Sequence, residues 1–294
     1  MLSFYRRPVA GHPTATVLVA MLSATAAMLM PVLAAAPAAA QRAMAPHEEA
    51  LLGLVNGRQR TEPNRVRDAF RRPFDVLQFL EIKPTSTVVE ISPGAVGYWT
   101  EILAPYLRDK GLYIAANPAP RSQASKANVD KFNAAFADKM ASDGVSFAKV
   151  QVLEWAPETP ENLQPNSADF VLTFRNLHNW IDRDVTDKAL ASFHRVLKAG
   201  GVLGIKDHRG RTDQPQDPKA KSGYVRQDYA IQMIEKAGFR LVATSEAVAN
   251  PKDTKDYAAG VWALPPTYRM KDQDRDKLTA IGESDRFLLA FVKR

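Results

Sequence analysis

The sequence contains no cysteine among its 294 residues. Disulfide bonds, thiolate catalysis, cysteine-ligated zinc, iron–sulfur clusters and a lipoprotein acyl anchor are therefore all excluded. A chain of this length, of which 46% is hydrophobic, can bury a core without covalent cross-links. The length suits one large α/β domain better than two full domains.

The motifs of several protein classes are also missing. The formal charge of +7 comes without an arginine-rich tract or an aromatic-basic ladder, so we expect no nucleic-acid partner. No glycine-x-serine-x-glycine motif is present, which disfavours serine hydrolase chemistry. The separations of His178, His194 and His208 match no metal-ligand pattern, and we expect no metal.

Residues 1–40 are typical of a signal peptide. Arg6 and Arg7 form a positive n-region, residues 14–33 are nearly uncharged and apolar, and the alanine-rich residues 34–40 offer cleavage sites. We expect cleavage after Ala40, export to a bacterial periplasm and no membrane span in the mature chain. The alternative is an uncleaved leader that anchors the protein in the inner membrane, because the apolar run is long enough to span.

Residues 41–83 predict an N-terminal helical segment made of two helices, the second over about residues 64–80. The charged residues of this second helix are expected to form a solvated face of a lid rather than part of a catalytic site. They are Arg65, Arg67, Asp68, Arg71 and Arg72.

The most informative stretch covers residues 86–107. β-branched and apolar residues predict a buried parallel strand up to Ile91, and a glycine-bearing turn follows from Pro93 to Gly97. From Trp99 onward, apolar residues recur at helical spacing. A strand, a tight turn and a helix N-terminus leave bare backbone N–H groups against which a ligand can lie. Glu90, near the end of the strand, is expected to face that ligand.

The rest of the chain predicts alternating strands and helices. Apolar runs near residues 112–116, 148–153, 169–174 and 202–207 predict further strands, and a final strand pair follows near residues 240–247 and 287–293. Residues 84–294 are thus expected to form one α/β domain, in which residues 250–285 are an irregular insertion over one face. Residues 175–180 predict a polar and aromatic loop at the edge of the sheet where ligands bind.

The ordered elements, the final strand pair and residues 195–203 resemble class I S-adenosylmethionine-dependent methyltransferases. More narrowly, residues 90–100, 175–180 and 207–209 are similar to an exported group of predicted methyltransferases. The resemblance covers about residues 65–294. It implies a Rossmann-like, seven-stranded sheet with the last strand antiparallel, helices on both faces, and S-adenosylmethionine as the cofactor.

The resemblance also implies which residues contact the cofactor. Asn117 stands where an acidic residue normally binds the ribose hydroxyls, Glu154 and Trp155 would lie beside the adenine, and Arg175 and Asn176 would close the pocket. Four further residues would shape the pocket for the methionine part: Glu90, Pro93, Gly94 and Gly97.

Two positions depart from the family pattern. Val96 stands where glycine is common, so its Cβ could crowd a ligand. Asn117 lacks the charge with which a carboxylate accepts hydrogen bonds more strongly. Both departures are expected to weaken cofactor binding.

His178 and His208 follow strands at the ligand edge, and Asp207 could orient a histidine. We therefore expect these three residues to be catalytic, with a histidine as general base toward a hydroxyl or amine of a small-molecule acceptor.

Two other functions are compatible with parts of this sequence. A nicotinamide dehydrogenase is disfavoured because the turn lacks glycine-x-glycine-x-x-glycine and the second strand ends in Asn117. The alternative function is an exported binding or scaffold protein that keeps the fold without catalysis, since S-adenosylmethionine is made in the cytoplasm. The polar groups gathered at the ligand edge favour the enzyme.

Overall fold

The computed structural model describes residues 43–294, of which residues 44–294 form one compact unit. The expected signal peptide, residues 1–40, lies outside these described residues. Within residues 43–294, no helix is both long and apolar enough to cross a membrane.

One seven-stranded sheet organises this unit, in the order β3-β2-β1-β4-β5-β7-β6. Strands β1 to β5 run parallel, and β7 is antiparallel to both β5 and β6. This topology confirms the expected sheet with its last strand antiparallel. The strands are β1 (Thr87–Ile91), β2 (Leu112–Pro118), β3 (Gln151–Trp155), β4 (Ala168–Phe174), β5 (Leu197–His208), β6 (Phe239–Ser245) and β7 (Arg286–Lys293).

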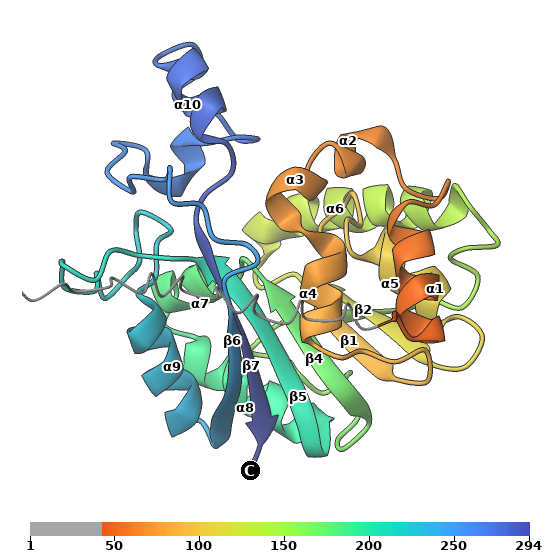
Figure 1. Cartoon of the computed structure of the whole chain (residues 1–294). Helices are drawn as coiled ribbons and strands as arrows, with labels where there is room; N and C mark the ends of the chain where they lie inside the picture. The colour runs from red at the N-terminus through yellow and green to blue at the C-terminus, as the bar shows by residue number, and fades with distance from the viewer. Residues whose placement is uncertain (1–42) are drawn as a thin grey trace, which may run out of the picture. The chain divides into compact units, whose positions relative to one another are not determined.

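Helices cover both faces of the sheet (Figure 1). The apolar side chains of α1 (Pro46–Val55), α4 (Pro73–Phe79), α5 (Thr100–Leu107) and α6 (Gln123–Ala141) share one core with Val88 of β1. Those of α7 (Leu177–Asp182), α8 (Thr186–Val196) and α9 (Gln227–Lys236) share the other core with Val89. Successive strand residues point to opposite faces, so two buried faces require the continuous apolar runs seen in the sequence.

The N-terminal segment contains four short helices rather than two. Besides α1 and α4, these are α2 (Glu62–Arg65) and α3 (Asp68–Arg71). The expected single helix over residues 64–80 is wrong because Arg72 is left-handed, with φ of 46°, and Pro73 follows it. Proline disfavours a helical conformation at the residue before it, so the chain ends one helix and begins another there.

Buried ion pairs attach this segment to the sheet domain. The side chain of Arg60 donates to Asp68 at 2.8 Å and to Glu101 of α5 at 3.3 Å. Glu101 also accepts from Lys139 of α6 at 2.6 Å. The N-terminal helices are therefore part of the domain's packing.

The insertion over residues 250–285 carries a 3₁₀ helix, η1 (Gly260–Ala263), and α10 (Arg275–Ile281), so it is only partly irregular. It projects beyond the edge where the parallel strands end, and α2 and α3 lie at that same edge (Figure 1). Asn250 closes its base by donating its amide to the carbonyls of Ile281 (2.9 Å) and Glu283 (2.7 Å).

Candidate active site

The turn after β1 leaves open space against the backbone. Ser92, Gly94 and Gly97 all have positive φ, of 52°, 83° and 57°. The N–H of Ser92 donates to the carbonyl of Ala116 at 2.9 Å, which ties the turn to β2. A Cβ added to Gly94 would meet no atom within 4 Å. Gly94 is therefore required for its φ, and the space beside it could hold a ligand.

Glu90 points inward from β1 and is only 2% exposed. The hydroxyl of Tyr113 donates to its Oε2 at 2.6 Å, while no described residue donates to Oε1. Burial raises the pKa of this carboxyl to about 7, although the Tyr113 hydrogen bond and the charge of Lys206 act in the opposite direction. One oxygen thus remains available to a ligand.

Asn117 ends β2 with its side chain enclosed, at 1% exposure. Its amide nitrogen donates to Oδ1 of Asn133 at 3.2 Å, and Asn133 donates in turn to Glu154 at 3.1 Å. Within residues 43–294, Oδ1 of Asn117 has no hydrogen-bond partner. A buried acceptor without a donor is costly, so this atom suits a ligand hydroxyl.

Residues 175–180 do not form the expected loop throughout, because α7 begins at Leu177. Asn176 donates its amide to the carbonyl of Ile91 (3.0 Å) and to the hydroxyl of Thr173 (3.1 Å). It therefore joins the ends of β1 and β4, the two strands where the sheet order reverses. Arg175 before it is left-handed, with φ of 66°.

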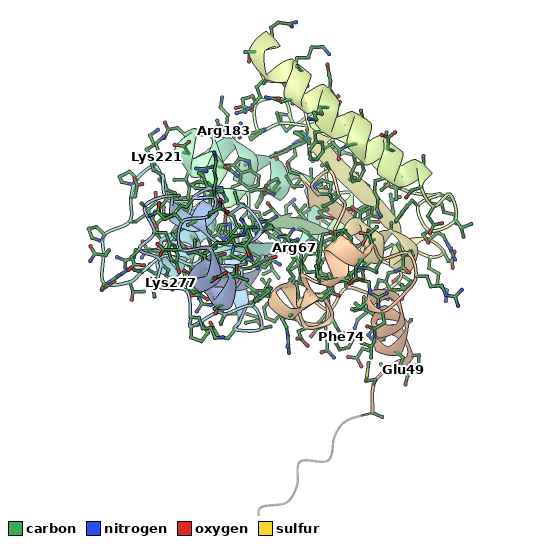
Figure 2. All side chains as sticks on the ribbon, turned by 90° about the horizontal axis from the view of Figure 1, so that it is seen from above. Glu49, Arg67, Phe74, Arg183, Lys221 and Lys277 are labelled. Carbon is green, nitrogen blue, oxygen red and sulfur yellow. The ribbon has the colours of Figure 1, made fainter. Side chains whose placement is uncertain are left out.

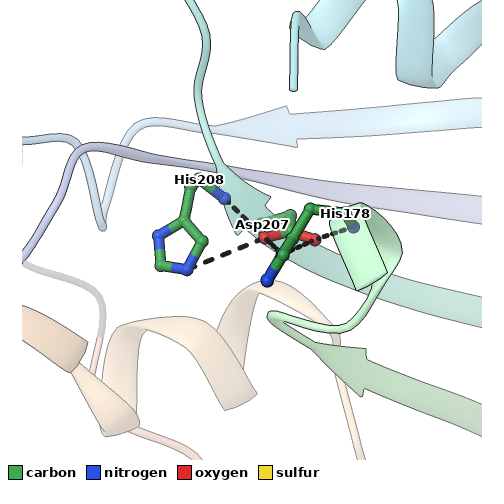
Figure 3. Close-up of side chains that lie close together, drawn as sticks. All are labelled: His178, Asp207 and His208. Carbon is green, nitrogen blue, oxygen red and sulfur yellow. Dashed lines mark hydrogen bonds and ion pairs between the residues drawn. The ribbon is translucent and has the colours of Figure 1, made fainter. Parts of the chain in front are cut away.

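His178 and Asp207 form a buried pair (Figure 3). Nδ1 of His178 hydrogen-bonds Oδ1 of Asp207 at 2.9 Å, and the backbone N–H of His178 donates to Oδ2 at 3.0 Å. The backbone N–H of His208 donates to Oδ1 at 2.7 Å. Asp207 thus fixes the imidazole through Nδ1, which leaves Nε2 as the nitrogen available for proton transfer.

His208 lies beside this pair, with its ring centre 5.2 Å from that of His178. Its Nδ1 hydrogen-bonds the hydroxyl of Ser284 at 2.5 Å. Burial, followed by His178 and then the charges of Arg286 and Arg175, lowers the pKa of His208 well below its usual value. His208 is therefore neutral at neutral pH.

The three catalytic candidates are also residue types that can bind a metal ion. His178, Asp207 and His208 each place one potential ligand atom within 4.8 Å of the others, although their sequence separations match no metal motif. Sequence spacing could not predict this cluster because the tertiary fold assembles it. The positive charges of Arg175 and Arg286 beside His208 would repel a divalent cation. The absence of a metal stays a prediction.

A cavity of about 180 Å³ lies beside His178 and His208. Arg175 and Arg286 border it, and the insertion contributes one side. Trp262 of η1 lies with its ring centre 6.0 Å from that of His178. The remaining lining residues are Asn179, Val261, Pro265, Pro266, Thr267 and Ser284. A larger hollow of about 410 Å³ lies over α7 to α9 and contains none of the expected site residues.

Comparisons with known proteins agree with this geometry. Residues 89–205 match the family described as "Methyltransferase domain". A search of curated proteins found none that matches. Among solved structures, the chain is similar to a SAM-dependent methyltransferase from Aquifex aeolicus, at 17% identity and a TM-score of 0.52, covering 84% of this chain and 98% of that one.

Two further structures have the same fold. A putative sarcosine dimethylglycine methyltransferase from Galdieria sulphuraria is 14% identical, with a TM-score of 0.51 and coverage of 79% of this chain and 89% of that one. The [4+2]-cyclase SpnF is 14% identical, with a TM-score of 0.55 and coverage of 83% and 92%. The chain has a class I methyltransferase fold. The matched domain implies S-adenosylmethionine as its cofactor.

The residues of this methyltransferase fold fit that cofactor. The open space beside Gly94 and the unpaired oxygen of Asn117 lie at the ends of β1 and β2, and the oxygen could accept a hydrogen bond from a ribose hydroxyl. Glu90, Gly94 and Asn117 would hold the cofactor there. Val96 is 58% exposed and its φ is not positive, so its side chain points outward in an ordinary conformation.

The two residues expected beside the adenine lie in different surroundings. Glu154 is exposed and accepts from Asn133. Trp155 is buried in the core, where its ring centre lies 5.8 Å from that of Trp180 and 5.4 Å from that of Phe193. Their contact with an adenine stays a prediction, as does a cofactor role for Pro93, Gly97, Arg175 and Asn176.

The structure corrects the expectation of a solvated charged face for Arg67 and Arg71. Arg71 is buried, and the structure places both beside Glu283, just before β7. Nε of Arg67 lies 2.6 Å from Glu283, and Nε of Arg71 lies 3.5 Å from it. Figure 2 shows Arg67 between the N-terminal helices and the C-terminal insertion.

Sequence reasoning also missed Lys206 and Arg286. Lys206 of β5 is buried, with its Nζ 4.4 Å from the ring centre of Trp99 and 4.8 Å from that of Phe174. Arg286 begins β7, directly opposite His208 in the sheet register, and its guanidinium donates to Glu283. A charged residue inside an apolar strand and one at the start of the last strand were the available signals.

Proposed function

We propose that the protein transfers a methyl group from S-adenosylmethionine to a small-molecule acceptor in the cell envelope. The observation that supports this proposal is the His178–Asp207 pair. It lies at the ligand edge of a methyltransferase fold and borders a cavity large enough for part of a small molecule. The acceptor would lie in that cavity, between the ends of β4 and β5 and the insertion.

S-adenosylmethionine supplies an electrophilic methyl group on a cationic sulfur, so the acceptor must present a lone pair and release a proton. Asp207 holds Nδ1 of His178, and Nε2 receives the proton from the acceptor's hydroxyl or amine. His208, neutral and hydrogen-bonded to Ser284, adds no competing positive charge near Nε2. Trp262 and the two prolines of the insertion line the cavity on the side opposite the sheet edge.

The fold alone does not determine the reaction, since one similar structure is named a cyclase. An exported binding or scaffold protein without catalysis would not need an imidazole fixed by a buried carboxylate. The pair therefore supports the enzyme over that alternative.

The first experiment is calorimetric titration of the mature chain, residues 41–294, with S-adenosylmethionine and S-adenosylhomocysteine. We expect micromolar binding of at least one of them. No binding of either at millimolar concentration would contradict the proposed function.

A second experiment separates catalysis from binding. Asp207→Asn should retain S-adenosylhomocysteine binding but lower the transfer of labelled methyl groups to an extract of the producing cells by about 10²–10⁴-fold, because the imidazole loses its orientation. Asp130→Asn, on the exposed face of α6, is the matched control and should leave transfer unchanged. Equal transfer by both variants would remove His178 and Asp207 from the mechanism.

We also propose that the protein acts after export, which only the sequence of residues 1–40 supports. N-terminal sequencing of the protein from the producing cell should find Gln41 first. Finding the intact leader on membrane-bound protein would favour the anchored alternative.

A further inference from the structure

Arg175 is held in an unusual conformation beside the acceptor cavity. Its φ of 66° is uncommon for a residue with a side chain, and its backbone N–H donates to the carbonyl of Lys206 at 2.7 Å. Its guanidinium borders the cavity and makes no hydrogen bond or ion pair with any residue in the described range 43–294. Its five N–H donors have no protein acceptor among these residues and lie at a partly open cavity, which leaves them available to a ligand.

The surroundings of Arg175 contain more positive than negative groups, although Asp207 acts on Arg175 and Glu90 lies near Lys206 and Arg71. Five cations, which we call the cation cluster, gather at this edge of the sheet: Arg67, Arg71, Arg175, Lys206 and Arg286. Across residues 43–294, Glu283 is the one carboxylate that forms ion pairs with the cluster, and Arg67, Arg71 and Arg286 already share it. Arg175 and Lys206 are left without an ion-pair partner among the described residues.

The pKa values of Arg175 and Lys206 reflect this excess of positive charge. Burial, and then the charge of Arg286, lowers the pKa of Arg175 to about 10. Burial, together with Arg286, Arg71 and Arg175, lowers the pKa of Lys206 well below its usual value. An anion in the cavity would offset the mutual repulsion of these groups.

We propose that this cavity is a subsite for an anionic group of the methyl acceptor, a carboxylate or a phosphate, and that Arg175 recognises it. The inference rests on the proposed function and adds the chemical class of the acceptor. Arginine's planar fork matches both anions through two parallel hydrogen bonds. With its anionic group on Arg175, the acceptor is held beside Nε2 of His178, which borders the same cavity.

The size and walls of the cavity limit the acceptor further. A volume of about 180 Å³ admits an anionic group with only a few additional atoms, so the anion belongs to a small acceptor or to the end of a larger one. Trp262 forms part of the wall, and the guanidinium of Arg269 lies over its ring, 4.4 Å from the ring centre. An apolar wall strengthens an ion pair by excluding water.

The cavity is separate from the predicted cofactor pocket. None of its lining residues belongs to the turn over residues 92–97 or to the end of β2. We therefore assign the anion at Arg175 to the acceptor, in place of the cofactor contact that the resemblance implies for Arg175.

The test is calorimetric titration of the mature chain with inorganic phosphate and with malonate, each with and without saturating S-adenosylhomocysteine. We expect at least one anion to bind in both conditions. Arg175→Met should weaken its affinity at least about tenfold, and Arg175→Lys should weaken it less, since the charge remains without the fork. Arg183→Met, at the other end of α7, is the matched control and should bind like the wild type.

The outcomes separate this inference from the proposed function. Absence of binding by both anions, with S-adenosylhomocysteine still bound, would overturn the anion subsite alone. Displacement of the anion by S-adenosylhomocysteine would place the anion in the cofactor pocket and would also overturn it. Failure of S-adenosylhomocysteine to bind would instead count against the methyltransferase. Binding of malonate but not phosphate would identify an acceptor with a carboxylate. Binding of phosphate but not malonate would identify a phosphorylated acceptor.

A second measurement needs no variant. Whichever of phosphate and malonate binds in the titration should raise the pKa of His208 in the wild-type protein, measured by NMR of its ring, because an anion would offset the charges of Arg175, Arg286 and Lys206. His178, Asp207, Tyr224 and Ser284 also face this ring, and they are present with and without the anion. An unchanged His208 titration would contradict anion binding in the cavity.

Discussion

The predicted cofactor pocket and the proposed acceptor cavity differ in their unpaired polar groups: the pocket has a hydrogen-bond acceptor, and the cavity has hydrogen-bond donors. At the pocket, Oδ1 of Asn117 is an acceptor without a donor, and Gly94 leaves space beside the backbone. At the cavity, the guanidinium of Arg175 offers donors, and no residue of the described range 43–294 accepts from them. The first region therefore suits a ligand with hydroxyl groups, and the second suits the anionic group that we propose for the acceptor. The comparison teaches that one sheet edge can select two chemically different ligands.

The two regions also differ in how the chain builds them. The turn of the pocket is one continuous stretch between β1 and α5, whose conformation follows from glycine and local hydrogen bonds. The cavity draws on the ends of β4 and β5, the start of β7 and the insertion. Ion pairs between distant residues hold it, so substitutions there should affect stability more than substitutions in the turn.

The largest effect is expected for Arg286→Met. Arg286 is buried and donates to Glu283, so its loss should lower the free energy of unfolding by about 3–5 kcal/mol. Urea denaturation measures this change. Arg72→Met, which breaks only an exposed pair with Asp75, should cost no more than about 1 kcal/mol. Equal losses in the two variants would show that the cation cluster does not hold the cavity together.

The second-largest effect is expected for Glu90→Gln, which should increase stability. Because its folded pKa of about 7 lies above its usual value of 4.5, wild-type stability falls as pH rises between these values. Glu90→Gln removes that penalty and should raise the free energy of unfolding by about 2–3 kcal/mol at pH 8, and by little at pH 4. Denaturation at both pH values tests this, with exposed Glu161→Gln as the unaffected control.

Glu90 also predicts the pH dependence of the cofactor pocket. If its free Oε1 accepts from a cationic group of the cofactor, ligand binding favours the ionised carboxylate. The affinity for S-adenosylhomocysteine should then rise as pH increases through about 7 and become constant above it. The Glu90→Gln variant should bind more weakly and without this dependence. A pH-dependent variant would show that another group causes the effect.

A smaller effect is expected for Gly94→Ala. A Cβ has space there, but φ of 83° is unfavourable for alanine, so the loss should be about 1–2 kcal/mol, accompanied by weaker cofactor binding. Gly53→Ala in α1 also has open space but no positive φ, and it should stabilise the protein by about 0.5–1 kcal/mol. Thermal unfolding of both variants distinguishes backbone strain from crowding.

The smallest effect is expected for Asn117→Ala. Removal of its unpaired oxygen should weaken S-adenosylhomocysteine binding about threefold to tenfold in calorimetry, while anion affinity at the acceptor cavity stays unchanged. Asn133→Ala removes the partner of the Asn117 amide but keeps that oxygen. The expected result is cofactor affinity closer to wild type for Asn133→Ala; the opposite order would exclude a ligand contact at Asn117.

The sequence predicted the strands more accurately than the helices. The expected strand over residues 86–91 is β1 (Thr87–Ile91), since a strand buried on both faces leaves a continuous apolar run. The break at Arg72 and the start of α7 at Leu177 were missed. Helix ends depend on single backbone conformations and tertiary contacts, to which hydrophobic periodicity is insensitive.

The catalytic candidates could be predicted because strand ends mark the ligand edge. His178, Asp207 and His208 were expected from their places after β4 and at the end of β5, and the structure brings them together. Trp262 and Ser284 carried no comparable signal, because both lie in the insertion, whose path no periodic pattern describes. Arg67 and Arg71 looked solvated because their partner, Glu283, is more than 200 residues away.

The amino-acid sequence by itself determined the order of elements, the glycine turn and the absence of thiol chemistry, because these depend on residue type and local spacing. Only the tertiary structure decided which charges are buried, which of them share Glu283 and which remain unpaired. The physical reason is that desolvation and ion pairing depend on distances through space. Arg175 and Arg286 are 111 positions apart in the chain, yet they border the same cavity.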